Sequence, residues 1–326
     1  MVEDAGTAVV LFTQGLPSLD PSCMSAPTLG MDSCMHLPHL HFGSTCPSPA
    51  LELAEQGWKA VFHLFHTETS FGPSQPTWEP MGRINVWRMG VVAYQDAMLA
   101  MEKMAILRAA DDEGDALLVC AHPPTFTLGK RARREHVKLS EEELAAHGIG
   151  VYQVPRGGQV TYHGPGQAVL YPVVSLRALQ VGARRWIEGL EDTMVETSRA
   201  FGVNAHGRVP GASGAWVGNK KIGAVGVRIS RGVSTYGLAY NVDTDLSAYD
   251  SLVACGFQEN VATSLAHELG PDADLSCATN VLVTSFLNHF HYTANDMEPR
   301  LKKKLLPRFT DIGTTTSQFP VRREAG

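Results

Sequence analysis

The stretch that decides the interpretation of this chain is Arg156-Gly157-Gly158-Gln159-Val160-Thr161-Tyr162-His163-Gly164-Pro165-Gly166-Gln167. Gly157 and Gly158 permit positive φ angles and let another molecule approach the backbone closely. Val160, Tyr162 and the apolar run that follows, Ala168–Val174, are typical of strands. The pattern predicts a backbone-lined pocket wall that leads into a buried strand. A β-hairpin turn with polar decoration is the alternative, and the local pattern alone does not separate the two.

The composition bounds the fold and the partners. A chain of 326 residues forms one large domain or two small ones. Hydrophobic residues make up 44% and charged residues 18%, which is ordinary for a soluble globular protein. The net charge of −6 gives no reason to expect nucleic acid or an anionic membrane as a partner. No apolar run approaches the length that spans a bilayer.

The cysteines indicate a reducing compartment rather than a disulfide framework, because none forms a C-x-x-C pair and the chain is long enough to build a core. The six cysteines are Cys23, Cys34, Cys46, Cys120, Cys255 and Cys277. Within the expected folded part, Cys255 is the one outside an apolar run or an expected helix, which makes it the candidate reactive thiol.

The chain divides into three regions. Residues 1–82 are rich in Pro, Ser, Gly, Thr and His with little hydrophobic periodicity, so we expect a disordered extension. That region is acidic and therefore a poor match to an organelle transit peptide, and its irregularly spaced histidines do not predict a metal site. Residues 83–295 are expected to form the folded domain. Residues 296–326 are expected to form a frayed tail.

Interleaved strands and helices predict one α/β (α+β) domain with a mixed sheet. Helices are expected over residues 92–110, 140–148 and 183–201, with a final one over 275–292. Strands are expected over residues 84–87, 116–120 and 235–242, and a hairpin over 214–229 that turns at Gly218-Asn219.

Three residues are chemical candidates, each with a plainer alternative. Cys255 precedes Gly256, which permits close approach of a substrate, but an ordinary loop cysteine fits as well. Lys221 opens a strand of small and apolar residues and would lower the pKa of a nearby thiol, unless it is a solvated strand-end lysine like Lys220. His163 is a base, a substrate hydrogen-bond donor or a structural loop histidine.

The opening stretch resembles the signature of the lipoyl(octanoyl) transferases, R-G-G-x-x-T-[FWY]-H-G-P-G-Q. Three further blocks resemble motifs of that family in the same order: His122–Gly129, Lys221–Gly226, and Gly237–Val242 continuing to Ala254-Cys255-Gly256. The resemblance runs from about Ile84 to Leu269 and is strongest to eukaryotic, plant-type members.

The resemblance implies the fold of the biotin/lipoate protein ligase catalytic domains and an octanoyltransferase activity. The octanoyl donor would be octanoyl-acyl carrier protein, and the acceptor a lysine of a lipoyl domain or of the glycine-cleavage H protein. It implies no cofactor, a monomer, Cys255 as the acyl-thioester nucleophile and Lys221 as the residue that lowers the pKa of that thiol. The residues implied to line the octanoyl site are Arg156, Gly157, Gly158, Gln159, Val160, Thr161, Tyr162, His163, Ala224, Val225, Gly226, Gly237, Leu238 and Ala239.

Three departures from the family pattern stand near these residues. Ala254 replaces the usual Pro before the cysteine, Tyr236 replaces a usual His, and Gly223 replaces a small residue that is commonly Ala. The alternative activities are an ATP-dependent lipoate–protein ligase and a non-catalytic binder of lipoyl domains. The resemblance to eukaryotic members implies a mitochondrial enzyme, with the plastid as the alternative.

Overall fold

The computed structural model describes residues 82–252, 262–270 and 273–307, all within one compact unit. Two sheets organise these residues: a seven-stranded sheet ordered β10-β1-β2-β6-β9-β8-β7 and a three-stranded sheet ordered β4-β3-β5. The strands are β1 (Gly82–Val91), β2 (Asp115–Ala121), β3 (Thr125–Leu128), β4 (Gly150–Gln153), β5 (Val160–His163), β6 (Gln167–Ser175), β7 (Gly214–Val217), β8 (Lys220–Ser230), β9 (Val233–Asn241) and β10 (Tyr292–Asp296).

Both sheets are mixed, as the sequence predicts. In the large sheet β1 runs parallel to β2 and β10, and the remaining neighbours are antiparallel. In the small sheet β3 is parallel to β4 and antiparallel to β5. The hairpin between β7 and β8 turns at Gly218, whose φ of 57° is the left-handed conformation that glycine adopts without strain.

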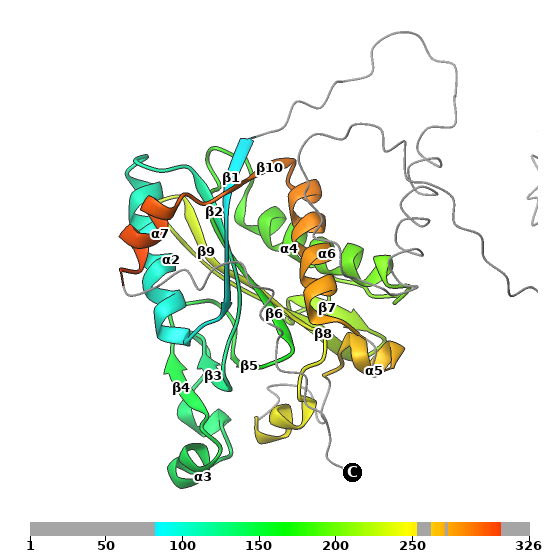
Figure 1. Ribbon diagram of the computed structural model, residues 1–326. Helices are drawn as coiled ribbons and strands as arrows, with labels where there is room; N and C mark the ends of the chain where they lie inside the picture. Colours follow the sequence, from blue (N-terminus) through cyan, green and yellow to red (C-terminus); the bar gives the residue numbers. More distant parts are fainter. Residues whose placement is uncertain (1–81, 253–261, 271–272, 308–326) are drawn as a thin grey trace, which may run out of the picture. The chain divides into compact units, whose positions relative to one another are not determined.

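Helices cover both faces of the large sheet (Figure 1). Helices α2 and α7 lie on one face, and α4 and α6 on the other. The helices are α2 (Tyr94–Ala109), α3 (Glu141–Ala146), α4 (Ala183–Ala200), α5 (Leu265–Leu269), α6 (Leu275–His289) and α7 (Pro299–Leu305), with 3₁₀ turns η1 (Arg134–His136) and η2 (Leu246–Ser251). Among the described residues, no helix has both the length and the apolar content that a bilayer span requires.

Strand β2 shows why strands of the large sheet appear in the sequence as continuous apolar runs. Leu117 and Val119 pack into the core under α4 and α6, whereas Ala116, Leu118 and Cys120 pack under α2. A strand covered on both faces buries every side chain, so the alternation of a half-exposed strand is absent. Burial of Cys120 raises the pKa of its thiol far above the ordinary value, so this cysteine is an inert core residue.

The expected end of the fold is wrong. The last expected helix stops at His289, and β10 then pairs with β1 before α7 begins at Pro299. Leu301 and Leu305, four residues apart, are buried in the core with α2, so this part of the expected tail is an ordered helix. The disordered extension was expected over residues 1–82. Of these, residues 1–81 lie outside the described residues, and Gly82 begins β1.

Asp115 joins four elements at the edge of the large sheet. Its carboxylate accepts hydrogen bonds from Arg108 Nε of α2 at 2.6 Å, the Ser175 backbone N–H of β6 at 2.9 Å and the Tyr292 hydroxyl of β10 at 2.6 Å. Asp115 and the Arg108 side chain are nearly buried, so these are charge-assisted bonds with little competition from water.

We predict that Asp115→Asn lowers the free energy of unfolding by about 2 kcal/mol, because it leaves buried donors with an uncharged partner. The matched control is Asp111→Asn, which removes the exposed second ion pair of Arg108 and should cost less than about 0.5 kcal/mol. Urea denaturation of both variants measures the difference, and equal losses would contradict a special role of Asp115.

Candidate active site

A pocket of about 320 Å³ brings together residues that lie far apart in the sequence. Its walls come from the glycine-rich stretch, strands β8 and β9, and a loop before β7. Every residue expected to line the octanoyl site contributes to it except Tyr162, and Lys221 lies in the same pocket. The residues of that set in the wall are Arg156, Gly157, Gly158, Gln159, Val160, Thr161, His163, Ala224, Val225, Gly226, Gly237, Leu238 and Ala239.

The glycine-rich stretch is a loop fixed from behind, which fits the pocket-wall interpretation rather than the hairpin turn. The buried Arg156 guanidinium donates from Nη2 to the Thr127 carbonyl at 2.8 Å and the Thr127 hydroxyl at 2.7 Å. The Gly129 N–H also donates to the Gln159 carbonyl at 3.1 Å. A Cβ on Gly129 would lie 2.6 Å from the Gly158 carbonyl, so only glycine allows this contact.

His163 is held as a neutral ring. Its Nδ1 lies 2.8 Å from Gln167 Oε1, an acceptor, so Nδ1 carries the hydrogen. Nε2 is then the acceptor for the Thr127 hydroxyl at 3.3 Å. Burial, with smaller contributions from His122 and the Arg156 charge, lowers the pKa of His163 to about 3. A ring with both nitrogens occupied and so low a pKa is a poor general base at neutral pH.

A second buried histidine lies beneath it, with ring centroids 5.9 Å apart. His122 Nδ1 donates to the Val92 carbonyl at 2.8 Å, and Nε2 accepts from the Tyr171 hydroxyl at 2.9 Å. Burial lowers the pKa of His122 to about 4. His163 and the Tyr94 ring stacked beside it line the pocket, and His122 lies behind them, outside the lining.

Lys221 is positioned by Ser213, in the loop before β7, and by Trp216 on β7. Its Nζ donates to the Ser213 carbonyl at 3.3 Å and lies 4.8 Å from the centroid of the Trp216 ring. Burial lowers the pKa of Lys221 to about 8, and Glu191 opposes this shift. The ammonium therefore still predominates at neutral pH, in a partly desolvated place beside an aromatic face.

The structure gives a different result for each of three further positions, Tyr162, Tyr236 and Gly223. Tyr162 is not part of the pocket lining, and its ring packs against those of Phe126 and Tyr249, with ring centroids 5.7 and 5.8 Å apart. Tyr236 lines the pocket with an unusual φ of 59°. A Cβ on Gly223 would meet the Met194 sulfur at 2.4 Å, the movable end of a flexible side chain.

Cys255 and Ala254 lie outside the described residues, as does Gly256. The described residues that flank this gap, Leu252 and Ala262, both line the pocket. Ala262 also forms a parallel bridge with Lys221, and the Thr263 N–H donates to the Lys221 carbonyl at 2.9 Å. The two ends of the gap are thus tied to the pocket.

Sequence reasoning missed several lining residues. They are Tyr94, Arg131, Tyr171, Ile187, Trp216, Asn241, Tyr249 and the loop Gly211–Ser213. Tyr171 stands in an apolar run and Ile187 in an amphipathic helix, where core packing is the ordinary interpretation.

Within the described ranges, no group of three or more His, Cys, Asp or Glu side chains is arranged to hold a metal ion.

Known proteins share both the sequence and the fold. The profile of the lipoyl protein ligase A/B catalytic domain matches residues 93–287. An octanoyltransferase of Chloroflexus aurantiacus is 41% identical over 225 residues, which cover 68% of this chain and 98% of that protein. The chain belongs to the octanoyltransferase family. The mitochondrial octanoyltransferase LIP2 of Arabidopsis thaliana is 42% identical over 185 residues, 57% of this chain and 79% of that protein.

Solved structures agree on the fold of this octanoyltransferase. A lipoate–protein ligase A structure with bound ATP superposes with a TM-score of 0.57 at 16% identity, covering 69% of this chain and 92% of that one. A bipartite lipoate protein ligase of Thermoplasma acidophilum gives 0.55 at 17% identity, covering 75% and 99%. The expected α/β fold with a mixed sheet is therefore confirmed as that of the lipoate–protein ligase catalytic domains.

We predict that the stability of the enzyme falls as the pH drops below about 6.5 because of the two buried histidines. Both stay neutral in the folded state, while the unfolded chain takes up their protons near the ordinary value of 6.5. Each histidine contributes a slope of up to about 1.4 kcal/mol per pH unit until the pH reaches its folded pKa. Urea denaturation between pH 7.5 and 5 should give a shallower slope for His163→Gln than for wild type, and identical slopes would contradict a neutral buried His163.

Proposed function

We propose that this octanoyltransferase takes the octanoyl group from octanoyl-acyl carrier protein onto the Cys255 thiol and passes it to a lysine of a lipoyl domain or of the glycine-cleavage H protein. The Cys255 thiolate attacks the donor thioester and the carrier thiol leaves. The acceptor amine then attacks the Cys255 thioester, forms an amide and releases the thiol. Two half-reactions at one site give ping-pong kinetics.

The observation that carries this proposal is that the chain on either side of Cys255 lies at the pocket containing Lys221. Leu252, which stands three residues before Cys255 in the sequence, lines the pocket. On the far side, Ala262 is bridged to Lys221 itself. We propose that the Cys255 thiol lies near the half-buried Lys221 ammonium, an electropositive setting that favours the thiolate.

The remaining wall suits the acyl chain. Val160, Val225 and Leu238 present apolar side chains, and the adjacent glycines expose backbone. Burying an octanoyl chain contributes roughly 5 kcal/mol at about 0.8 kcal/mol per methylene, enough to favour that chain in a fitted site. His163, neutral and fixed, is assigned to positioning the thioester rather than to proton transfer.

An ATP-dependent ligase on the same fold is the second candidate. One solved structure with this fold is of a ligase that holds ATP, but at 16% identity the likeness concerns the fold alone. A ligase activates free acid as an adenylate and needs no cysteine nucleophile, whereas the transferase uses a thioester donor. A non-catalytic binder of lipoyl domains would need neither Cys255 nor Lys221.

We predict that Cys255→Ser loses octanoyl transfer by at least about a thousandfold, because the nucleophile of both half-reactions is gone. The assay incubates enzyme, octanoyl-acyl carrier protein and a lipoyl domain, and measures the octanoylated domain by mass spectrometry. Wild-type enzyme with the donor alone should gain the mass of one octanoyl group, and Cys255→Ser should not. Cys120→Ser is the control, since that buried thiol lies outside the pocket lining.

The same assay separates the rivals. Transfer from free octanoate that depends on ATP would identify a ligase, and a normal rate in Cys255→Ser would refute the thioester route. No adduct and no transfer by the wild-type enzyme would favour the binder.

We propose that the enzyme works in mitochondria. The similarity to a mitochondrial plant octanoyltransferase supports this compartment, although relatives of comparable identity are bacterial. We expect the protein, tagged at its C-terminus and expressed in its own cells, to co-fractionate with mitochondria. Mass spectrometry of its N-terminus should find a start within residues 1–82. Recovery in plastids would contradict the proposal.

A further inference from the structure

The loop that holds the Lys221 ammonium is itself anchored from outside the pocket. This wall loop, residues 207–213, contributes Gly211, Ala212 and Ser213 to the lining. Its Ser213 carbonyl is the acceptor for Lys221 Nζ at 3.3 Å. The position of that carbonyl therefore depends on what fixes the loop.

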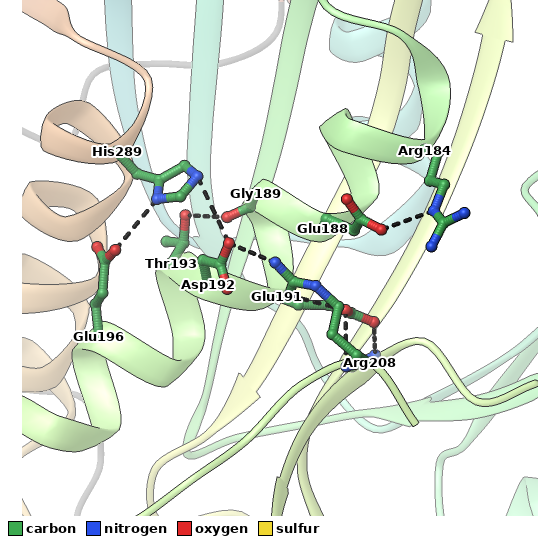
Figure 2. Close-up of polar contacts among 10 residues, drawn as sticks. Arg184, Glu188, Gly189, Glu191, Asp192, Thr193, Glu196, Arg208 and His289 are labelled. Atoms are coloured by element: carbon green, nitrogen blue, oxygen red, sulfur yellow. Dashed lines mark hydrogen bonds and ion pairs between the residues drawn. The ribbon is translucent and has the colours of Figure 1, made fainter. Parts of the chain in front are cut away.

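One carboxylate, Glu191 of α4, fixes both ends of the wall loop (Figure 2). Glu191 Oε2 accepts from the Arg208 backbone N–H at 3.1 Å and from Arg208 Nη1 at 3.2 Å. Glu191 Oε1 accepts from the Gly214 N–H at 2.9 Å, where β7 begins. Only 3% of Glu191 is exposed, so these three donors replace its hydration.

The surrounding charges reinforce the anchor. Arg208 Nη2 also donates to Asp192 at 2.6 Å, so two neighbouring acids of α4 bind one guanidinium. His289 of α6 lies on the far side of Asp192, at 4.0 Å, and its Nδ1 is 3.2 Å from Glu196 Oε1. Arg208 is therefore the cation directly paired with Glu191, and the other groups act on Asp192 and Glu196.

We propose that Glu191 is a positioning residue for Lys221, which it holds in place through the wall loop and keeps charged through its own negative charge. The proposal rests on the function proposed above for Lys221. A buried ion pair is weak evidence of stability, because desolvation offsets most of the attraction. A role at the active site explains why an acid is buried at this position, whereas packing alone does not.

The electrostatics point the same way as the geometry. Burial and the Arg156 charge disfavour the Lys221 ammonium, and Glu191 is the group that favours it. Glu191 on α4 forms its ion pair with Arg208 rather than with Lys221 on β8, so its effect on Lys221 acts through space and through the Ser213 carbonyl. Replacing Glu191 by an uncharged isostere removes both contributions.

The test is Glu191→Gln against the matched control Glu188→Gln on the same helix. Glu188 pairs at 2.8 Å with Arg184, whose side chain is 91% exposed (Figure 2), and acts on Arg208 of the wall loop only through space. We expect Glu191→Gln to lower kcat about tenfold with KM for the octanoyl donor changed less than about threefold. We also expect the alkaline limb of the rate profile to move to lower pH by about half a unit or more, as Lys221 loses its proton earlier. Glu188→Gln should retain both wild-type values.

A double-mutant cycle decides whether Glu191 acts through Lys221. Glu191→Gln added to Lys221→Ala should cause no further loss, whereas additive losses or an unmoved pH profile would overturn the proposal. If Glu191→Gln fails to fold, Arg208→Met loosens the same anchor from a side chain that is 43% exposed. It should lower kcat without moving the limb to lower pH, because the Glu191 charge remains, and an unchanged kcat would overturn the positioning role. If Lys221→Ala transfers at the wild-type rate, the proposed function of Lys221 fails and this inference with it. If only the Glu191 effects are missing, the inference alone fails.

Discussion

The site depends on the hydrogen bonds of the Gln167 side chain, because they join the two sheets where the pocket lies. Gln167 begins β6 of the large sheet and is 1% exposed. Its Nε2 donates to the Tyr162 carbonyl at 3.1 Å and to Asn241 Oδ1 at 2.9 Å, while Oε1 accepts from His163. Every polar atom of one buried amide is thus used to fix β5 of the small sheet against β6 and β9 of the large one. Losing any of these partners would leave a buried group unsatisfied, which costs about 1–3 kcal/mol.

The same network reaches Lys221 without passing through residues 253–261. Asn241 Nδ2 donates to the Thr263 carbonyl at 3.0 Å, and the Thr263 N–H donates to the Lys221 carbonyl at 2.9 Å. The backbone of Lys221 is therefore fixed by the core on one side, and its ammonium by Ser213 on the other. Site geometry and sheet packing are set by one continuous set of hydrogen bonds, which is why a small loop can present a rigid wall.

Local patterns in the sequence predicted what local physics determines. The helix from Ala183 was correct to within one residue of its observed end, because its apolar spacing persists over five turns and Gly202 ends it. The pocket wall at the glycine-rich stretch was also correct. Long-range pairing was not accessible: nothing local shows that Leu301 packs against α2, nor that Glu191, a polar residue on an amphipathic helix, is buried against a loop. The resemblance to a known family supplied the role proposed for Cys255, which spacing alone left open.

Under the proposed mechanism, the pocket has to satisfy two opposed demands. An octanoyl chain favours an apolar wall, whereas a reactive thiolate needs a nearby cation, and an apolar wall discharges that cation by desolvation. The pKa of Lys221, lowered by burial to about 8, reflects this desolvation of the ammonium. Adding an acid inside the pocket would restore the ammonium but would also repel the thiolate and hydrate the acyl site. Placing the acid on α4, behind the wall loop, keeps the lining apolar and still acts on the lysine, since Coulomb interactions are weakly screened where water is excluded. The buried position of Glu191 and the carbonyl contact of Lys221 are then two parts of one arrangement. The wall loop between them holds the Lys221 side chain in position, and the Glu191 charge behind the loop keeps that side chain protonated.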